Sequence, residues 1–533
     1  MPPLVQAPIN PPALCNQYDV IVCGAGSSGS VIARRLSDDP NLQVLLIDAG
    51  SSDQIPSVQE ASQWHHNIGS TTDWGYQSEP AANLNHRQLP MSMGKVLGGG
   101  SGINVMIWAR GHQSDWDYFA EQAGDSAWNY QSVLDIYRRI EDWRGLPDPR
   151  RGRGGPVVVS PSSADKHPLA TALISAAGSV GLPVFNSPNG EMMEHHSGGA
   201  LSDVRIVDGQ RQSVFESYVR PVLGRPNLTV VTDTLVDRVV LDGRQATGVE
   251  LIYRGERQRV LATHQVVLST GAINSPSILM RSGIGDRRTL AELGIESMQH
   301  LPGVGHGLQD HTCFELVWES STPVPPVDNG SAATLYARSQ TTRLSPDIVM
   351  CQAEFPMSTL KASGSPVPAA GWTLVTGLAQ PQSRGRVSLR SADPNVAPRI
   401  ELNALSDSHD WEVARAAIRF AQEVGRSSVF GSLAAREAIP GPMNDSALDE
   451  FLRNGATSFW HQTCTARMGR DELSVVDAQL AVHGLENLTV ADGSIMPRIT
   501  TGNTMAPCVI IGERAASILA TKLGCTSNAR TSP

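Results

Sequence analysis

A glycine-rich turn close to the start of the chain constrains the fold more than any other feature. The apolar residues 20–23 have the length of a buried strand, and the pattern Gly24-x-Gly26-x-x-Gly29 follows them directly. In this dinucleotide fingerprint Gly24 permits the tight turn, Gly26 lets the backbone approach a pyrophosphate, and Gly29 lets a helix pack closely on the strand. Helix-compatible residues continue to position 36. The sequence therefore predicts a strand–turn–helix unit that binds a nucleotide.

A second predicted strand, residues 44–47, ends at Asp48. This acid lies about 20 residues beyond the last glycine of the fingerprint, where a carboxylate binds a ribose hydroxyl. The start of the predicted helix, at Ser27 and Ser28, offers free N–H groups and a partial positive charge to phosphates. An acid at this point favours an adenosine with a free 2′-hydroxyl, as in FAD or NAD, over NADP. These residues alone do not choose between FAD and NAD.

Length and composition limit the remaining possibilities. A chain of 533 residues is long enough for two to four domains. With 40% hydrophobic and 18% charged residues, it is predicted to be a globular protein with a large core. The net charge of −10 argues against a nucleic-acid or anionic-membrane partner. No apolar run is long enough for a membrane span, so none is predicted.

The cysteines and the two ends of the chain suggest a cytoplasmic protein. Seven scattered cysteines, none spaced C-x-x-C, predict reduced thiols and no metal site. Residues 1–17 are proline-rich and lack the basic and apolar regions of a secretory signal, so none is predicted. Residues 1–13 and 526–533 are expected to be flexible tails.

Further motifs follow the fingerprint in a recognisable order. A second glycine-dense segment, residues 93–104, leads into the apolar residues 105–109, and three adjacent glycines there predict a close backbone approach. Together with the later motifs, this segment makes the chain resemble the glucose–methanol–choline (GMC) family of FAD-dependent oxidoreductases. The motifs that carry the resemblance are residues 24–29 with Asp48, 94–104, 110–116, 271–285, 301–305, 308–311, 461–469 and 492–507.

The resemblance implies an α/β fold in which a Rossmann-like FAD-binding domain is interleaved with an antiparallel-sheet substrate domain. We assign residues 14–158, 200–310 and 456–525 to the FAD-binding domain. Residues 159–199 and 311–455 are assigned to the substrate domain, where the recognisable motifs stop and where substrate selectivity is expected to lie. Within the first domain, Asp242-Gly243 is predicted to be a hairpin turn.

The resemblance also implies FAD in preference to NAD. Some relatives attach FAD covalently through a histidine in the glycine loop, but this chain has Ile103 at the matching position. FAD is therefore predicted to bind non-covalently. The expected cofactor-binding residues are Gly24, Gly26, Ser27, Ser28, Gly29, Asp48, Ala49, Gly94, Val96, Gly99, Asn104, Val105, Val236, Gly271, Trp460, Asp492, Gly493, Asn503, Thr504 and Met505.

His461 and Asn503 match the catalytic positions of the family. A histidine with its ordinary pKa near about 6.5 can take a hydroxyl proton at neutral pH. The Asn503 amide can hold the substrate oxygen, and it can also cap the helix predicted from about residue 507 to 523. The start of that helix is expected to stabilise the anionic reduced flavin. Residues 462–466 depart from the usual family sequence, which is expected to affect the pocket shape.

The implied activity is the oxidation of an alcohol to an aldehyde, with His461 as base and a hydride passing to flavin N5. Primary alcohols, including benzylic or furanic ones, are favoured over choline because the loop histidine is missing. Electrons are expected to pass to O2 or to a quinone-like acceptor, so both oxidase and dehydrogenase remain open. The alternatives are a hydroxynitrile lyase on the same fold and a flavoprotein scaffold without catalysis.

Overall fold

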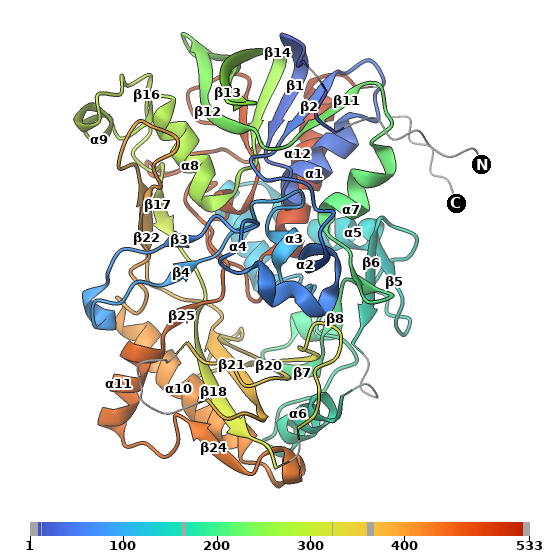
Figure 1. Cartoon of the computed structure of the whole chain (residues 1–533), viewed down its shortest axis with the longest axis vertical. Helices are drawn as coiled ribbons and strands as arrows, with labels where there is room; N and C mark the ends of the chain where they lie inside the picture. The colour runs from blue at the N-terminus through green and yellow to red at the C-terminus, as the bar shows by residue number, and fades with distance from the viewer. Residues whose placement is uncertain (1–8, 12, 163–166, 322, 360–366, 526–533) are drawn as a thin grey trace.

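Two seven-stranded sheets dominate the molecule (Figure 1). The computed structural model describes residues 9–11, 13–162, 167–321, 323–359 and 367–525. The predicted tails, residues 1–13 and 526–533, lie largely outside these described residues. The sheets occupy opposite ends of the molecule.

The first sheet carries the nucleotide fingerprint. Its strand order is β11-β2-β1-β14-β13-β12, and β26 also pairs with β14. The β11, β2, β1, β14 and β26 pairings are parallel, whereas β14, β13 and β12 form an antiparallel meander. The strands are β11 (Leu228–Val231), β2 (Val44–Ile47), β1 (Gln17–Cys23), β14 (Glu256–Leu268), β13 (Gln245–Tyr253), β12 (Leu235–Asp242) and β26 (Leu488–Val490).

Apolar strands and close helix packing explain the core of this layer. Each residue of β2 is 0% exposed, as expected for parallel strands covered on both faces. Helices α1 (Ser27–Leu36) and α12 (Met505–Lys522) pack against one another beside the sheet. Gly512 makes their approach possible, since a Cβ there would lie 2.8 Å from the carbonyl oxygen of Ser28.

The second sheet is antiparallel and has two different faces. Its order is β24-β18-β21-β20-β19-β7, and β25 pairs with β18. Alternate residues of β18, such as Phe314 and Leu316, join a core with the helices, while Cys313 and Glu315 line a cavity. The elements are β24 (Arg436–Ile439), β18 (Thr312–Glu319), β21 (Gly371–Leu378), β20 (Ile348–Ala353), β19 (Ala333–Ala337), β7 (Gly198–Leu201), β25 (Thr457–Ser458), α6 (Pro168–Ser179), α10 (Ser408–Gly425) and α11 (Asp445–Gly455).

Shorter elements connect the two sheets. The helices are α2 (Pro56–Gln59), α3 (Gly100–Ile103), α4 (Gln113–Ala123), α5 (Tyr130–Ile140), α7 (Val214–Tyr218), α8 (Gly271–Arg281) and α9 (Arg287–Glu292). The strands are β3 (Tyr76–Gln77), β4 (Pro90–Met91), β5 (Glu141–Trp143), β6 (Val157–Pro161), β8 (Asp203–Val204), β9 (Ile206–Val207), β10 (Gln210–Arg211), β15 (Ile284–Gly285), β16 (Gln299–His300), β17 (His306–Leu308), β22 (Gly385–Ser388) and β23 (Arg399–Glu401).

The predicted mixed α/β fold, with a Rossmann-like unit and an antiparallel second sheet, is confirmed. The domain boundaries stay a prediction, and two short strands that lie partly or wholly in the segments assigned to the first domain pair with the second sheet. β7 extends over the boundary between residues 199 and 200 to pair with β19, and β25, assigned to the first domain, pairs with β18 of the second sheet. Backbone pairing thus attaches both strands to the second sheet.

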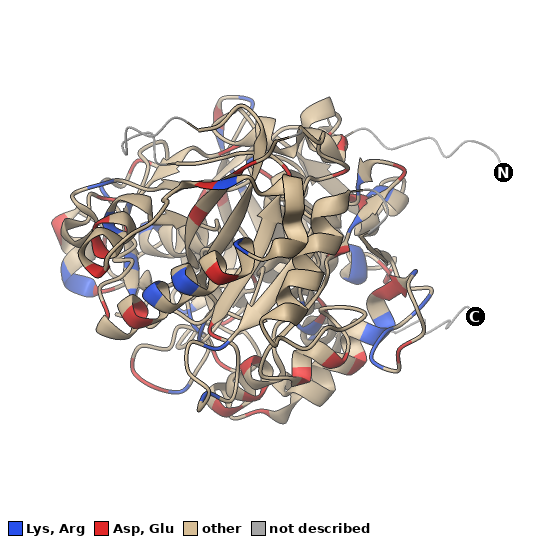
Figure 2. Ribbon diagram, turned by 90° about the horizontal axis from the view of Figure 1, so that it is seen from below, with Lys and Arg blue, Asp and Glu red and all other residues tan. Residues whose placement is uncertain are grey.

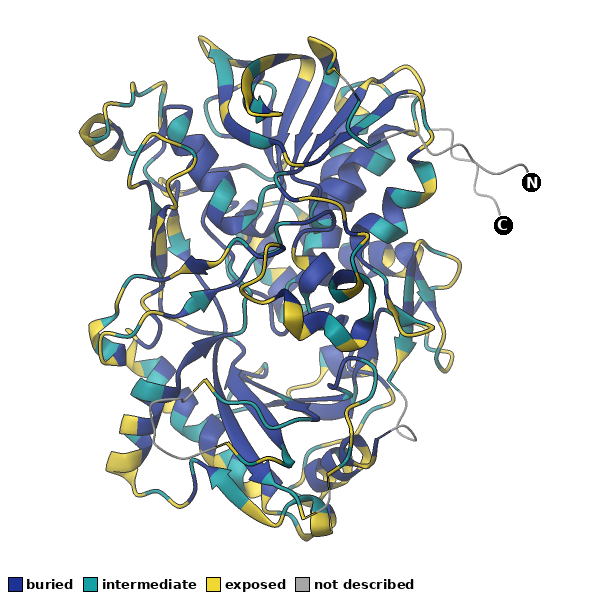
Figure 3. Cartoon of the chain, in the orientation of Figure 1, coloured by how far each residue is buried: buried dark blue, intermediate teal, exposed yellow. Residues whose placement is uncertain are grey.

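Buried residues fill both sheets and the helices against them (Figure 3). Acidic and basic residues are interspersed over the outer helices and loops (Figure 2). All seven cysteines are free thiols. Among the described residues no helix is long and apolar enough to cross a membrane.

Candidate active site

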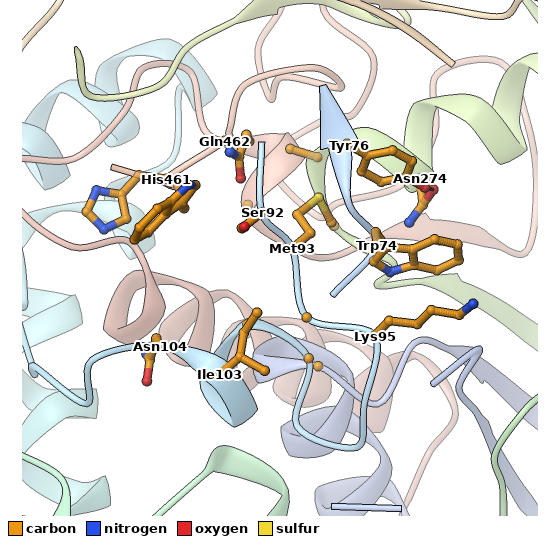
Figure 4. A pocket seen from close by; sticks show the side chains of 18 of the residues that line it. Trp74, Tyr76, Ser92, Met93, Lys95, Ile103, Asn104, Asn274, His461 and Gln462 are labelled. Carbon is orange, nitrogen blue, oxygen red and sulfur yellow. Dashed lines mark hydrogen bonds between the residues drawn. The ribbon is translucent and has the colours of Figure 1, made fainter. Parts of the chain in front are cut away.

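One cavity connects the fingerprint with the second sheet. It has a volume of about 1090 Å³, which exceeds the usual range for a drug-sized ligand. Gly24 and Asp48 line one end, whereas His461 and Asn503 line the other together with residues of β18 and β20. Figure 4 shows His461 and Gln462 on one side, Trp74 and Tyr76 on the other, and Ile103 rising from α3.

Eighteen of the twenty predicted cofactor residues line this cavity, and Gly29 and Val96 do not. Gly29 is needed for packing, because a Cβ there would lie 1.9 Å from the carbonyl oxygen of Gly24. Val96 is completely buried and packs with Val58 and Ile103. These two residues thus lie outside the cavity wall, and the assignment of the twenty residues to the cofactor stays a prediction.

The fingerprint turn leaves room for an extended anionic ligand. Gly24 has a φ of +100°, which an L side chain rarely adopts. Gly26 precedes α1 and no side chain caps the N-terminus of this helix. A Cβ on Gly26 would meet nothing closer than 4.0 Å, whereas a Cβ on Gly99 would lie 2.9 Å from the Cα of Gly26. The two glycine loops thus form a bare backbone cradle, which fits the pyrophosphate of FAD.

Asp48 is held rigidly at the end of β2. Its Oδ2 accepts a hydrogen bond from the Ala25 N–H and its Oδ1 accepts one from the Gly50 N–H, each at 2.7 Å. Burial raises the pKa of this carboxyl to about 7. Each oxygen retains a lone pair for a further donor, so the position suits a ribose hydroxyl.

Asp492 joins two elements at the same carboxyl edge of the first sheet as Asp48. It follows β26, and its Oδ2 accepts hydrogen bonds from the Gly271 N–H at 2.9 Å and from the Ser275 hydroxyl at 2.5 Å. Its Oδ1 accepts a third from the Ser494 N–H at 2.8 Å. The carboxylate thereby ties the start of α8 to the loop after β26.

His461 and Asn503 are brought together although 42 residues separate them. Asn503 Nδ2 lies 3.1 Å from His461 Nε2. On the far side of the ring, His461 Nδ1 lies 2.8 Å from Nδ1 of His311, whose Nε2 is 3.2 Å from the carbonyl oxygen of Ala379. His461, Asn503 and His311 all line the cavity, and the His311 side chain is completely buried.

This chain of hydrogen bonds determines where the ring protons lie. The Ala379 carbonyl only accepts, so His311 carries its proton on Nε2 and accepts at Nδ1. His461 must then donate from Nδ1, which leaves the lone pair of Nε2 directed toward Asn503 and the cavity. Burial lowers the pKa of His311 to about 4, and burial followed by the effect of His311 lowers the pKa of His461 well below its ordinary value. The neutral form with a basic Nε2 is therefore favoured.

A buried carboxylate shapes the turn that presents His461. Asp310 accepts a hydrogen bond from the His461 N–H at 2.8 Å and another from the Ser458 hydroxyl. Ser458 Oγ in turn accepts from the Trp460 N–H at 2.7 Å, and Trp460 has a φ of +62°. Burial raises the pKa of Asp310 to about 7. The strained backbone at Trp460 is thus fixed by neighbouring hydrogen bonds.

The last helix starts beside this pair. α12 begins at Met505, two residues before the predicted start, and no side chain caps its N-terminus. The predicted capping role of Asn503 is therefore wrong, because its amide is directed to His461. The partial positive charge of the helix end lies next to the cavity-lining Thr504 and Met505,.

Sequence reasoning singled out neither His311 nor Asp310 as a functional residue. Both belong to the motif at residues 308–311, and their neighbours in space lie about 150 residues later in the chain. The sequence signal that could have identified these two residues is a polar Asp-His pair directly before an apolar strand. Among the described residues no cluster of three or more His, Cys, Asp or Glu is placed to hold a metal ion.

Comparisons with known proteins agree with this geometry. Two family models described as GMC oxidoreductase match residues 18–313 and 381–512. The oxygen-dependent choline dehydrogenase of Burkholderia ambifaria is 35% identical over 530 residues, which cover 94% of this chain and 93% of that protein. The same enzyme of Klebsiella pneumoniae is 35% identical over 536 residues, covering 94% and 96%. The crystal structure of pyridoxine 4-oxidase from Mesorbium loti superposes with a TM-score of 0.89 at 33% identity, covering 94% and 98%.

Proposed function

The chain belongs to the GMC oxidoreductase family, which oxidises alcohols with FAD, and from this premise we propose that it converts a primary alcohol to an aldehyde with His461 as base. The observation that carries the proposal is the hydrogen-bonded series His311, His461, Asn503 at one end of the cavity. The other end holds the glycine cradle. An alcohol at the His461 end would therefore lie within reach of both the base and a cofactor that extends from the cradle along the cavity.

FAD supplies the acceptor for the electrons of the substrate when it is bound. The chain's own residues would hold it at three points: the α1 N-terminus at Gly26 for the pyrophosphate, Asp48 for the ribose, and the uncapped α12 N-terminus for the ring. The cavity of about 1090 Å³ is large enough for this cofactor and a small alcohol.

The proton of the alcohol is handled by His461 and Asn503. An alcohol oxygen that replaces the direct hydrogen bond between Asn503 and His461 would accept a hydrogen bond from Asn503 Nδ2 and donate its proton to the lone pair of His461 Nε2. As the proton arrives, the His461 Nδ1–H remains bonded to His311, which keeps the ring in place.

The wall around His461 supports a substrate with an apolar or aromatic body. Phe459 stacks on the His461 ring with centroids 5.6 Å apart and planes 10° apart. Trp460, Val349 and Val375 also line this end of the cavity. Apolar side chains with a few directed polar groups are typical of small-molecule sites. We therefore favour ring-bearing primary alcohols, such as benzylic ones, over choline.

A screen of alcohols tests the proposed function. The purified holoprotein is given benzylic, furanic and aliphatic primary alcohols and choline, with air plus peroxide detection in one series and with an artificial electron acceptor without air in the other. We expect turnover with ring-bearing primary alcohols and peroxide formation in air, in keeping with the oxygen-dependent relatives. Turnover of choline alone would overturn the substrate class, and flavin that no alcohol reduces would overturn the activity.

Ile103 predicts that the flavin is released on denaturation. Its side chain has no atom able to form a bond to the flavin ring, and it occupies the position of the loop histidine. Acid precipitation should leave the yellow colour in the supernatant, as measured by its absorbance. Colour that stays with the washed pellet would contradict non-covalent binding.

Replacing His311 with leucine should lower kcat/KM roughly fivefold. The change removes the acceptor for the His461 Nδ1–H, and one neutral hydrogen bond contributes about 1 kcal/mol. Steady-state kinetics measures this loss of kcat/KM, with each rate divided by the amount of bound FAD determined from its absorbance. An unchanged kcat/KM would show that the His461 tautomer does not depend on His311.

The acidic limb of the kcat/KM profile should lie below pH 6.5, the ordinary pKa of histidine. A base works only when deprotonated, so a lowered pKa keeps His461 active to lower pH, and activity is lost as the pH falls through that pKa. The pH dependence of kcat/KM, recorded with a saturating electron acceptor, measures this pKa. A limb centred above the ordinary histidine value would contradict the buried, uncharged His461.

A further inference from the structure

Two arginines are buried behind the glycine loop. Arg205 and Arg211 are 1% and 4% exposed. Arg211 lies on β10 and pairs with Ile206 of β9, and Arg205 directly precedes β9. They lie close enough that the charge of Arg205 contributes to lowering the pKa of Arg211. Arginine is rarely buried unless an opposite charge accompanies it.

Arg211 binds the end of α3. Its Nη1 donates to the backbone oxygen of Asn104 at 2.6 Å, to the side-chain oxygen of Asn104 at 2.8 Å and to the Ser101 carbonyl at 3.2 Å. Its Nε donates to the Val58 carbonyl at 2.7 Å. The side-chain oxygen of Asn104 also accepts from the Met106 N–H. Arg211 therefore fixes the Asn104 amide, which lines the cavity.

Arg205 lies against the start of α12. Its Nη1 is 3.8 Å from the sulfur of Met505, and its Nη2 donates to the Ser217 hydroxyl at 2.6 Å and to the Ser213 carbonyl at 3.3 Å. Its guanidinium also lies over the ring of Trp108. Met505 lines the cavity, so Arg205, like Arg211, is separated from the cavity by one residue.

Neither guanidinium has a carboxylate partner in the part of the chain that the structure describes. Each keeps one buried nitrogen without a hydrogen-bond partner, Nε of Arg205 and Nη2 of Arg211. Burial lowers their pKa values to about 10 and about 9. Other buried arginines of this protein are paired, since Arg110 and Arg151 both contact Glu141. The contrast indicates that the counter-charge is supplied by a bound group.

We propose that Arg205 and Arg211 are positioning residues whose buried positive charges stabilise the anionic reduced form of FAD and thereby raise its reduction potential. The inference rests on the proposed FAD site and adds to it a source of charge beyond the α12 N-terminus. Oxidised flavin is neutral in its ring and gains negative charge on reduction, so fixed positive charges nearby favour the reduced state. Their separation from the cavity by Asn104 and Met505 makes the effect electrostatic.

Sulfite affinity and reduction potential test this without any alcohol. Sulfite adds its electron pair to N5 of the oxidised ring, which becomes anionic, so its dissociation constant reports the same stabilisation. We compare holoprotein carrying Arg205→Met or Arg211→Met with wild type. Each Met variant should bind sulfite at least tenfold more weakly, and a tenfold change in the reduction equilibrium corresponds to about 30 mV for a two-electron couple. Arg514→Met, which changes a half-buried arginine of α12 outside the cavity wall, should match wild type.

Lysine variants separate charge from hydrogen bonding. Arg205→Lys and Arg211→Lys keep the charge and lose the guanidinium fork, so their sulfite affinity should stay within about threefold of wild type. Lysine variants that lose as much as the methionine variants, or methionine variants that match wild type, would overturn the proposal. If one methionine variant does not retain FAD, the proposal is tested by the sulfite affinity of the two lysine variants and of the methionine variant at the other arginine. Failure of every alcohol to reduce a flavin that still binds sulfite would instead refute the proposed function.

Discussion

Replacing His461 with alanine should lower kcat/KM for the alcohol by roughly 10²- to 10⁴-fold, the usual contribution of a general base. The variant loses the one lone pair that the His311 hydrogen bond directs to Asn503 and the cavity. FAD should remain bound, because the glycine cradle and Asp48 lie at the other end of the cavity.

The measurement is kcat/KM per bound flavin, with the flavin content taken from absorbance. His264→Ala is a suitable control, since this side chain is half-exposed on β14 and is not part of the cavity wall. A His461 variant that binds FAD and retains the wild-type rate would remove His461 as the base.

Gly26→Ala should weaken FAD binding roughly 10- to 100-fold, equal to about 1.4–2.8 kcal/mol. The protein itself tolerates the added methyl group, because no atom lies closer than 4.0 Å to the position of its Cβ. The methyl group would instead occupy the space in which a pyrophosphate approaches the backbone. Apoprotein stability, measured by denaturant unfolding, should match wild type, while FAD titration shows the loss.

Gly29→Ala is the matched comparison. A Cβ at Gly29 would lie 1.9 Å from the Gly24 carbonyl oxygen, so this variant should destabilise the apoprotein itself. If Gly26→Ala bound FAD as tightly as wild type, the phosphates would not lie against this turn.

Local patterns made the first layer predictable. The apolar run ending at Cys23, the fingerprint glycines and Val44–Ile47 each have a short-range signature, and the structure has β1, α1 and β2 there. The hairpin predicted at Asp242-Gly243 is present between β12 and β13, with its turn one residue later, at Gly243 and Arg244. A two-residue turn is set by its own sequence, which explains why it could be predicted. Buried parallel strands need only to be apolar, which a sequence displays directly.

Contacts between distant segments could not be predicted in the same way. His311 and Asp310 contact His461 although about 150 residues separate them in the chain. The periodicity of a sequence does not predict contacts at this separation. Gly29 and Val96 belong to genuine motifs, yet whether a motif residue faces the ligand or the core depends on packing. In the sequence Arg205 and Arg211 cannot be distinguished from exposed arginines, because the burial of a cation is a property of the folded chain.

The most direct test of the central claim is anaerobic mixing of the holoprotein with a benzylic alcohol, in ordinary form and with deuterium on the carbinol carbon, while flavin absorbance is followed. If the alcohol is oxidised at this site with His461 as base, the yellow colour is bleached, deuterium slows the bleaching, and His461→Ala slows it by at least about 100-fold at the same FAD content. Flavin that stays yellow with every primary alcohol, or bleaching at the same rate in His461→Ala, would contradict the account.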